Sequence, residues 1–171
     1  MKSLLRGVSL FLFLAVLRGP ASAQQLALRF SSGFSLIDYQ PSLGAGWDGE
    51  LEGIWRPIPE MELGLEAELS VPLPTGQETS PSKFLVRTSP FVGLRFGDEQ
   101  RWSYLRAGFG LAGHVRDDFI STGVLTAAAG FVVAPSTLVV AFGFEVCGKI
   151  ELLGSLPSRA VGLTGFVEYE F

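Results

Sequence analysis

Long hydrophobic runs are missing from this sequence, although 47% of its 171 residues are hydrophobic. A membrane-spanning helix needs about 20 consecutive apolar residues, and the longest apolar stretch, residues 8–17, is far shorter. Elsewhere the apolar residues alternate with glycine, serine and charged residues. The sequence therefore excludes spanning helices. Any segment that crosses a membrane must do so as a β-strand in a closed barrel, the other structure that satisfies its backbone hydrogen bonds in lipid.

Cysteine and basic residues are also scarce. The first scarcity excludes an intramolecular disulfide, and the second excludes a nucleic-acid partner. The single cysteine, Cys147, cannot form an intramolecular disulfide, and strand alternation turns it toward a barrel interior as a small buried residue. Once residues 1–23 are set aside, 10 basic and 17 acidic side chains remain, a net charge of −7. Because nucleic acids bind basic surfaces, this balance excludes a nucleic-acid partner.

The first 23 residues have the three parts of a secretory signal peptide. Lys2 and Arg6 supply the positive start, the apolar stretch 8–17 follows, and the small residues 19–23 end in an Ala-x-Ala cleavage site. We therefore expect a cleaved signal peptide at 1–23 and one mature domain at 24–171.

Residues 24–171 divide into eight segments with the two-residue period of a β-strand. The predicted strands are 26–35, 43–55, 61–71, 84–96, 102–113, 121–133, 138–149 and 159–171. In the third, odd positions are apolar while even positions include Glu62, Glu66 and Glu68, which a helix would scatter around its circumference. The sixth rests on its place in the alternation, because the alanines at 127–129 would suit a helix equally well.

Pro90 interrupts the strand predicted at 84–96. Because proline cannot donate a hydrogen bond within a sheet, we expect a β-bulge there. A bulge would reverse the facing of half the strand, so the orientation of Arg87 stays open.

The segments predict a closed barrel of antiparallel neighbouring strands. They run about 10–13 residues, close to the roughly 9–11 of a tilted membrane-spanning strand, and short turns alternate with longer connections. A soluble lipocalin-like or avidin-like barrel would have the same period with its faces exchanged. The membrane alternative is favoured because the less apolar face is mainly Gly, Ala and Ser, and because only two lysines, Lys83 and Lys149, follow the signal peptide.

Aromatic residues near predicted strand ends indicate the two membrane–water interfaces. The expected interface residues are Trp47, Trp55, Phe96 and Trp102. Trp102 fits least well, because strict alternation from Arg106 would turn it inward.

The chain ends on Phe171, two residues after Tyr169 in an alternating strand. Together with the signal peptide and the even strand count, this ending resembles small eight-stranded outer-membrane β-barrel proteins of the OmpA/OmpX type in Gram-negative bacteria. The resemblance implies an all-β, antiparallel up-and-down transmembrane barrel in the cell outer membrane, in contact with outer-membrane lipids, monomeric and without a cofactor. It also implies that the outer-membrane assembly machinery recognises Tyr169 and Phe171.

An eight-stranded barrel is just wide enough for side chains to fill it, and its predicted inward faces carry long ionisable residues. They are Arg29, Glu50, Glu52, Glu62, Glu66, Arg95, Arg106, Glu145, Glu168 and Glu170. Because an unpaired buried charge is costly, we expect pairs across the lumen, Arg29 with Glu168 and Arg95 with Glu62. Acids outnumber bases, so one or two glutamates must be protonated, hydrated or near the rim. The prediction is a plugged barrel that does not conduct ions.

No motif selects one function. The predicted role is structural or surface interaction without catalysis, and the alternative is a narrow conduit or binding barrel for small apolar molecules, opened at Pro90. A lipid-modifying enzyme would have to use His114, the single histidine. The lipid A deacylase pattern, however, places a serine two positions after its histidine, and position 116 is arginine. Asp117 and Asp118 are interpreted as solvated loop charge rather than a calcium site, so no catalytic or metal site is predicted.

Overall fold

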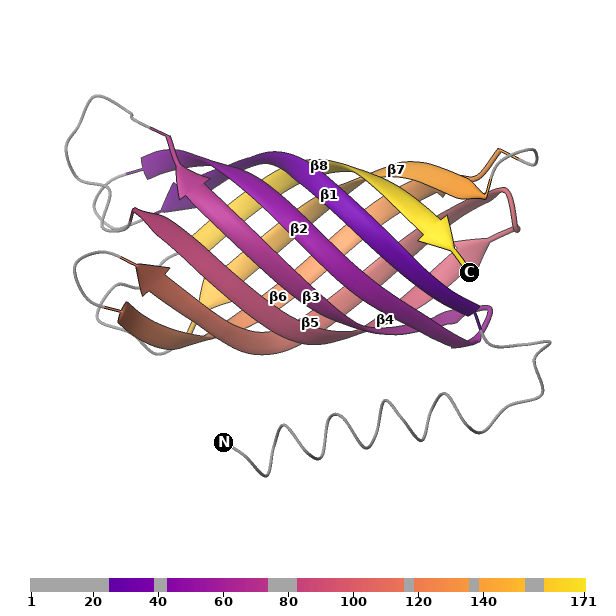
Figure 1. The fold of residues 1–171 in the computed structure, drawn as a ribbon, viewed down its shortest axis with the longest axis horizontal. Helices are drawn as coiled ribbons and strands as arrows, with labels where there is room; N and C mark the ends of the chain where they lie inside the picture. Colours follow the sequence, from indigo (N-terminus) through magenta and orange to yellow (C-terminus); the bar gives the residue numbers. More distant parts are fainter. Residues whose placement is uncertain (1–24, 39–42, 74–82, 116–118, 136–138, 153–158) are drawn as a thin grey trace.

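The described residues of the computed structural model form eight strands that close into one barrel (Figure 1). The structure describes residues 25–38, 43–73, 83–115, 119–135, 139–152 and 159–171, so the predicted signal peptide at 1–23 and the residues Asp117 and Asp118 lie outside it. The strands are β1 (Gln25–Asp38), β2 (Leu43–Ile58), β3 (Met61–Pro72), β4 (Phe84–Gly97), β5 (Arg101–Val115), β6 (Phe119–Val133), β7 (Val140–Glu151) and β8 (Arg159–Glu170). None of these residues forms a helix that is long and apolar enough to cross a membrane.

Each strand pairs antiparallel with its neighbours in the chain, and β1 pairs with β8 to close the sheet. Closure leaves no sheet edge, so backbone donors and acceptors along the wall find partners within it. The prediction of an all-β, eight-stranded antiparallel up-and-down barrel is confirmed, including β6 with its run of alanines. β1 begins and β8 ends at the same end of the barrel (Figure 1), which we call the terminus end. The opposite end is called the loop end.

Alternation gives the wall two chemically different faces. Large apolar side chains such as Phe30, Leu111 and Val161 point outward and are 57–60% exposed. Charged side chains point inward, and Arg29 and Glu52 are fully buried. A soluble protein would not expose so continuous an apolar surface, whereas a barrel surrounded by lipid requires one. The faces are those of a transmembrane barrel.

The bulge predicted at Pro90 is wrong. β4 keeps one register with β5 on both sides of it, from Phe84–Val115 to Gly97–Trp102, although the pairs at residues 89 and 90 are missing. The proline side chain faces outward, and the Ser89 hydroxyl donates a hydrogen bond to the Pro90 carbonyl at 3.3 Å. The missing donor therefore interrupts the sheet locally without shifting it. Since the facing does not reverse, Arg87 points into the barrel and is 2% exposed.

An irregularity does occur at the end of β2. The register between β2 and β3 shifts between Trp55 and Ile58, on either side of Pro57, as expected for a proline that cannot join the hydrogen-bond ladder. The strand continues through this bulge, so the turn predicted from residue 56 to residue 60 is only the pair Pro59–Glu60. Arg56 consequently belongs to the strand and is buried in the lumen.

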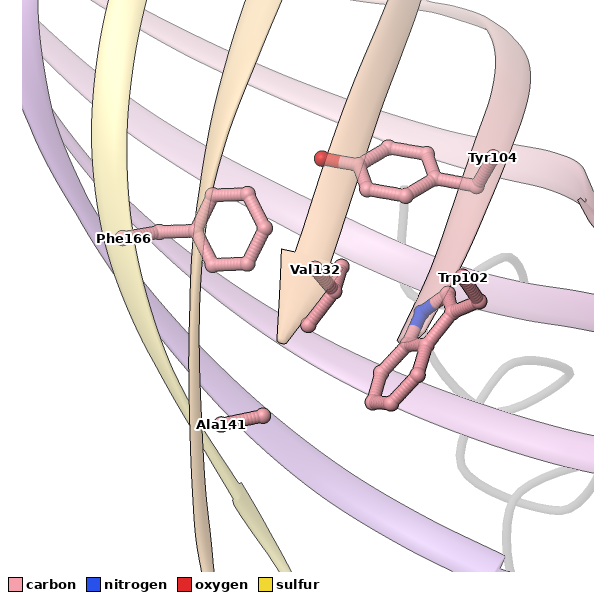
Figure 2. Packing of buried hydrophobic residues seen from close by; sticks show 5 residues of the cluster. All are labelled: Trp102, Tyr104, Val132, Ala141 and Phe166. Atoms are coloured by element: carbon pink, nitrogen blue, oxygen red, sulfur yellow. The ribbon is translucent and has the colours of Figure 1, made fainter. Parts of the chain in front are cut away.

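Trp102 was predicted at the membrane interface, and this is wrong. It is 2% exposed inside the barrel, where it joins a cluster with Tyr104, Val132, Ala141 and Phe166 (Figure 2). The even positions of β5 all face inward, so the strand period outweighs the general preference of tryptophan for an interface. The other three predicted interface residues, Trp47, Trp55 and Phe96, are on the outer face.

The turn between β4 and β5 depends on one glycine. Gly97 has a φ of 138°, and a Cβ atom there would lie 2.3 Å from the carbonyl oxygen of Arg101. Asp98 stabilises the same turn, since its Oδ1 accepts hydrogen bonds from the backbone N–H groups of Gln100 and Arg101 at 2.8 and 2.7 Å. Only glycine fits the first position of this turn without strain.

We expect Gly97→Ala to lower the free energy of unfolding by about 1–3 kcal/mol, the usual cost of a strained backbone. Urea unfolding of the barrel in lipid vesicles would measure the change. Gly53→Ala is the matched control, because a Cβ atom at Gly53 meets no atom within 4 Å, and its effect should stay within about 0.5 kcal/mol. Equal destabilisation by both substitutions would contradict the role given to Gly97.

Candidate functional site

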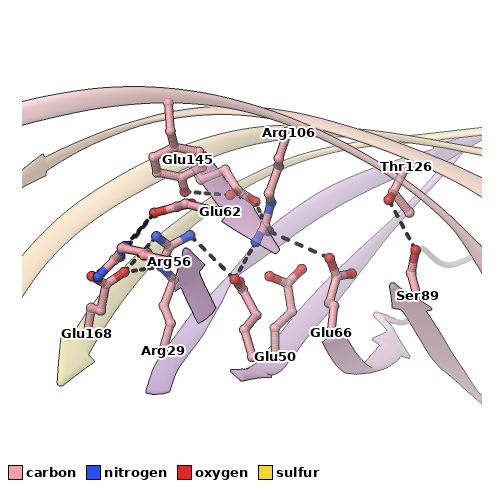
Figure 3. A network of polar contacts seen from close by, with 12 residues as sticks. Arg29, Glu50, Arg56, Glu62, Glu66, Ser89, Arg106, Thr126, Glu145 and Glu168 are labelled. Carbon is pink, nitrogen blue, oxygen red and sulfur yellow. Dashed lines mark hydrogen bonds and ion pairs between the residues drawn. The ribbon is translucent and has the colours of Figure 1, made fainter. Parts of the chain in front are cut away.

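The chemically distinctive part of the molecule is its lumen, where charged side chains from seven of the eight strands meet (Figure 3). Two groups of contacts can be separated. The terminus-end network consists of Arg29, Glu52, Arg56, Glu62, Arg95, Tyr104, Arg106, Glu145, Glu168 and Glu170. The loop-end network consists of Glu50, Glu68, Arg87, His114, Lys149 and Glu151.

Arg29 occupies the centre of the terminus-end network. Its Nε and Nη2 atoms both donate to Oε2 of Glu168, at 3.0 and 2.7 Å, and its Nη1 reaches Glu52 at 3.4 Å. The guanidinium carbon lies 4.5 Å from the ring centre of Tyr104 and 4.3 Å from that of Phe166. Arg29 pairs with Glu168 because the two residues are direct partners across β1 and β8, and the aromatic rings add cation–π attraction to the ion pairs.

Arg56 joins three carboxylates near the end of the barrel. Its guanidinium contacts Glu62 at 3.0 Å, Glu168 at 2.5 Å and Glu170 at 2.6 Å. The predicted pair between Arg95 and Glu62 also forms, at 3.8 Å between Nε and Oε1. The side chains of Arg95 and Glu170 are 11% and 35% exposed, so these two lie at the rim. Glu62 is held mainly by Arg56, which the sequence had assigned to a turn.

Arg106 links the two halves of the lumen. It pairs with Glu52, with Glu145 at 2.8 Å and with Glu66 at 3.6 Å. Figure 3 shows its guanidinium between the carboxylates of Glu145 and Glu66. The Tyr104 hydroxyl donates to the other oxygen of Glu145 at 2.6 Å. Each oxygen of Glu145 therefore has a donor, and Arg106 is held in place from two sides.

The loop-end network extends from Glu50 toward the loop end of β5, where His114 lies. The Lys149 ammonium lies 2.9 Å from Glu50 and 2.8 Å from Glu68, which in turn accepts a hydrogen bond from Arg87 at 2.7 Å. Arg87 also lies 3.8 Å from Glu151. The contacts that begin at Glu170 reach Glu66, and this second group begins at Glu50.

His114 completes the loop-end network. Its Nε2 atom lies 2.7 Å from Oε2 of Glu151, and both side chains are 1–2% exposed. The histidine is therefore enclosed by the barrel and engaged by a carboxylate, rather than placed on an open loop.

Comparison with known proteins identifies the architecture. No protein-family model and no curated protein matches the sequence. Among solved structures, Neisserial surface protein A has a TM-score of 0.69 at 14% identity, with 90% of this chain and 100% of that one aligned. The attachment invasion locus protein Ail of Yersinia pestis has a TM-score of 0.54 at 13% identity over 87% and 99% of the two chains. The fold is that of small outer-membrane β-barrels.

A third small outer-membrane barrel is the outer membrane enzyme PagL, with a TM-score of 0.52 at 12% identity over 84% of this chain and 98% of that one. Proteins of different kinds therefore share this fold. Identities this low establish the architecture alone, so function has to be argued from side chains.

The prediction from sequence identified some of the residues in the two lumen networks and missed others. All ten predicted charged residues face the lumen, with Arg95 and Glu170 at its rim. Alternation in β3 also pointed to Glu68, but it was not included. Arg56 was missed because Pro57 was expected to end the strand in a turn, whereas the strand continues through a bulge. Arg87 was missed because Pro90 was expected to cause a bulge, whereas the register is unchanged there. Lys149, Glu151 and His114 were missed because they lie at the ends of their predicted strands or just beyond them.

Proposed function

We propose that the chain is an integral outer-membrane protein whose lumen is plugged by ion pairs, and that it has a structural or surface-interaction role without catalysis. The observation that carries the proposal is that two networks of buried ion pairs occupy the lumen, one reaching from Glu170 to Glu66 and the other from Glu50 to His114. These side chains engage one another inside the barrel, along the path that a solute crossing the lumen would have to take.

The plug follows from the size of the barrel. Eight strands enclose a space that side chains can fill, and here that space holds Arg29 in contact with two aromatic rings and Arg106 among three carboxylates. A passing ion would have to separate such pairs, and breaking one buried pair costs about 3–5 kcal/mol. The closed lumen therefore supports a role that does not depend on transport.

Orientation follows from the connections. The terminus end has the two-residue turn Pro59–Glu60 and the three-residue turn 98–100, whereas the longest connection between strands, residues 73–83, lies at the loop end. Outer-membrane barrels place short turns in the periplasm and longer loops outside the cell. We therefore assign the terminus end to the periplasm, with the outer-face aromatics Trp55 and Phe96 near that interface and Trp47 nearer the other. The extracellular connections are the segments available for surface interaction.

Two observations argue against the alternatives. His114 is buried and paired with Glu151, which favours a structural role over a general base that must reach substrate. The wall at Pro90 is packed rather than open, because a Cβ atom at Gly108 would lie 2.6 Å from Ser89 Oγ and 2.7 Å from Thr126 Oγ1. A conduit for small apolar molecules through this seam has correspondingly less support.

Planar-bilayer recording tests the plug. We expect the wild-type protein to show no steady single-channel conductance, because the ion pairs fill the lumen. Arg106→Ala removes the side chain that joins three carboxylates and should produce measurable conductance. Arg159→Ala, on the outer face of β8, is the control and should behave as wild type. Large, steady conductance from the wild type would overturn the proposal, provided that gel mobility confirms a folded barrel in each sample.

A further inference from the structure

The loop half of the lumen has far more acidic than basic groups. Of the described residues, five buried carboxylates belong to it, those of Asp48, Glu50, Glu66, Glu68 and Glu151. They face two buried bases, Arg87 and Lys149, while Arg106 reaches Glu66 only at 3.6 Å. Isolated buried carboxylates are strongly disfavoured, so this part of the barrel requires additional positive charge.

Three of these carboxylates converge. One oxygen from each of Glu50, Glu66 and Glu68 lies within 4.8 Å of those of the other two. The carboxylates of Glu50 and Glu66 lie next to each other in Figure 3. All three side chains are at most 4% exposed. The cluster is therefore a compact, enclosed group of oxygen atoms.

Some of these oxygens have no donor. Oε1 of Glu66 and Oε2 of Glu50 are buried and have no hydrogen-bond partner among the described residues. Nearby in β2, both carboxylate oxygens of Asp48 are in the same situation. Lys149 contacts Oε1 of Glu50 and Oε2 of Glu68, and Arg106 reaches Oε2 of Glu66. Oε2 of Glu50 and Oε1 of Glu66 are therefore left without a positive partner.

We propose that this cluster binds one calcium ion, held by Glu50 and Glu66 with Glu68 as the third carboxylate. The ligands are all oxygen atoms, which hard cations prefer. Calcium–oxygen distances are about 2.3–2.6 Å, so one ion can bridge oxygens up to roughly 5 Å apart, which includes the observed 4.8 Å limit. Magnesium would require roughly 4.2 Å across the ion and retains water that this enclosed space accommodates poorly. The ion ties β2 to β3 and supplies the missing charge.

The test uses the mature protein refolded into lipid vesicles in the presence of either CaCl2 or EDTA, because an enclosed ion would enter during folding. After removal of free metal on a chelating resin, elemental analysis gives calcium per protein, and the gel-mobility shift on heating gives the transition temperature. We expect about one calcium per barrel and a higher transition temperature after refolding in calcium.

Glu66→Gln should abolish both calcium retention and the difference in transition temperature. Glu170→Gln, which alters a partly exposed carboxylate at the other end of the lumen, should retain both. Glu50→Gln provides a second test if the first variant does not fold. The proposal is overturned if the wild type retains no calcium, if Glu66→Gln retains as much as wild type, or if magnesium is retained in its place. It is also overturned if Glu66→Gln stabilises the EDTA-refolded barrel while the wild type binds no metal, because the missing charge would then be a proton.

Discussion

Replacing Arg29 by alanine is expected to cause a larger loss of stability than any other lumen substitution considered. The change removes an ion pair at 2.7 Å to Glu168, a contact to Glu52 and two aromatic stacking contacts. Removing one partner of a buried pair typically costs about 3–5 kcal/mol, because the remaining charge stays buried. Urea unfolding in lipid vesicles should show a loss of that size.

A double-mutant cycle separates this effect from lost packing. Arg29→Met keeps most of the side-chain length. Adding Glu168→Gln removes the negative charge whose Oε2 would have lost its partner, while still offering an oxygen to Arg56. We expect the double variant to be more stable than Arg29→Met alone, since residues in one network are coupled. Arg159→Met, on the exposed outer face, should change little. Additive effects of the two lumen substitutions would contradict the importance of the pair.

The fold could be predicted from the sequence because the two-residue period of a β-strand recurs along most of residues 25–171. In β3, for example, leucines alternate with Glu62, Glu66 and Glu68, and both faces keep their chemistry throughout. An even number of strands then closes β1 against β8, and this closure makes Arg29 the direct neighbour of Glu168. Information that is local and repeated was sufficient for architecture and for this ion pair.

The remaining lumen residues could not be assigned from the two-residue period alone, because their facing depends on how a proline affects strand register. Both prolines remove a backbone donor, yet Pro90 leaves the register unchanged while the register shifts around Pro57. Which outcome occurs depends on the hydrogen bonds of neighbouring strands, and it decides whether Arg56 and Arg87 are seen as lumen residues. Trp102 is the opposite case, because strict alternation was right and the residue-type preference was misleading.

Convergence of side chains was the hardest feature to predict. Lys149 in β7 reaches Glu50 in β2 and Glu68 in β3, strands that do not pair with β7. Their contact crosses the lumen, so it depends on the tilt of the strands and the length of each side chain. The sequence indicates which residues face inward and which of them meet on neighbouring strands, but not which of them meet across the lumen.

Deleting Phe171 is expected to abolish assembly in cells while leaving the folded barrel almost as stable as before. The residue is 70% exposed, its ring contacts Tyr169 at 4.9 Å between centroids, and its N–H donates one hydrogen bond to Leu26 at 2.9 Å. Losing one terminal hydrogen bond costs about 0.5–1.5 kcal/mol. Refolding of the purified chain into vesicles should therefore proceed nearly as in wild type.

The expected defect arises instead from recognition, because the terminal aromatic residue resembles the signal by which assembly machinery selects outer-membrane barrels. Cells producing the truncated chain should accumulate it in the periplasm or degrade it, which fractionation and surface labelling would measure. Phe96→Ala removes another exposed aromatic at the same end of the barrel and should still assemble. If the truncated chain reaches the surface normally, the terminal residue is not the signal. If it also fails to refold in vitro, the loss is one of stability rather than of recognition. A defect confined to cells is the result that separates the two, since the same barrel wall is present in both experiments.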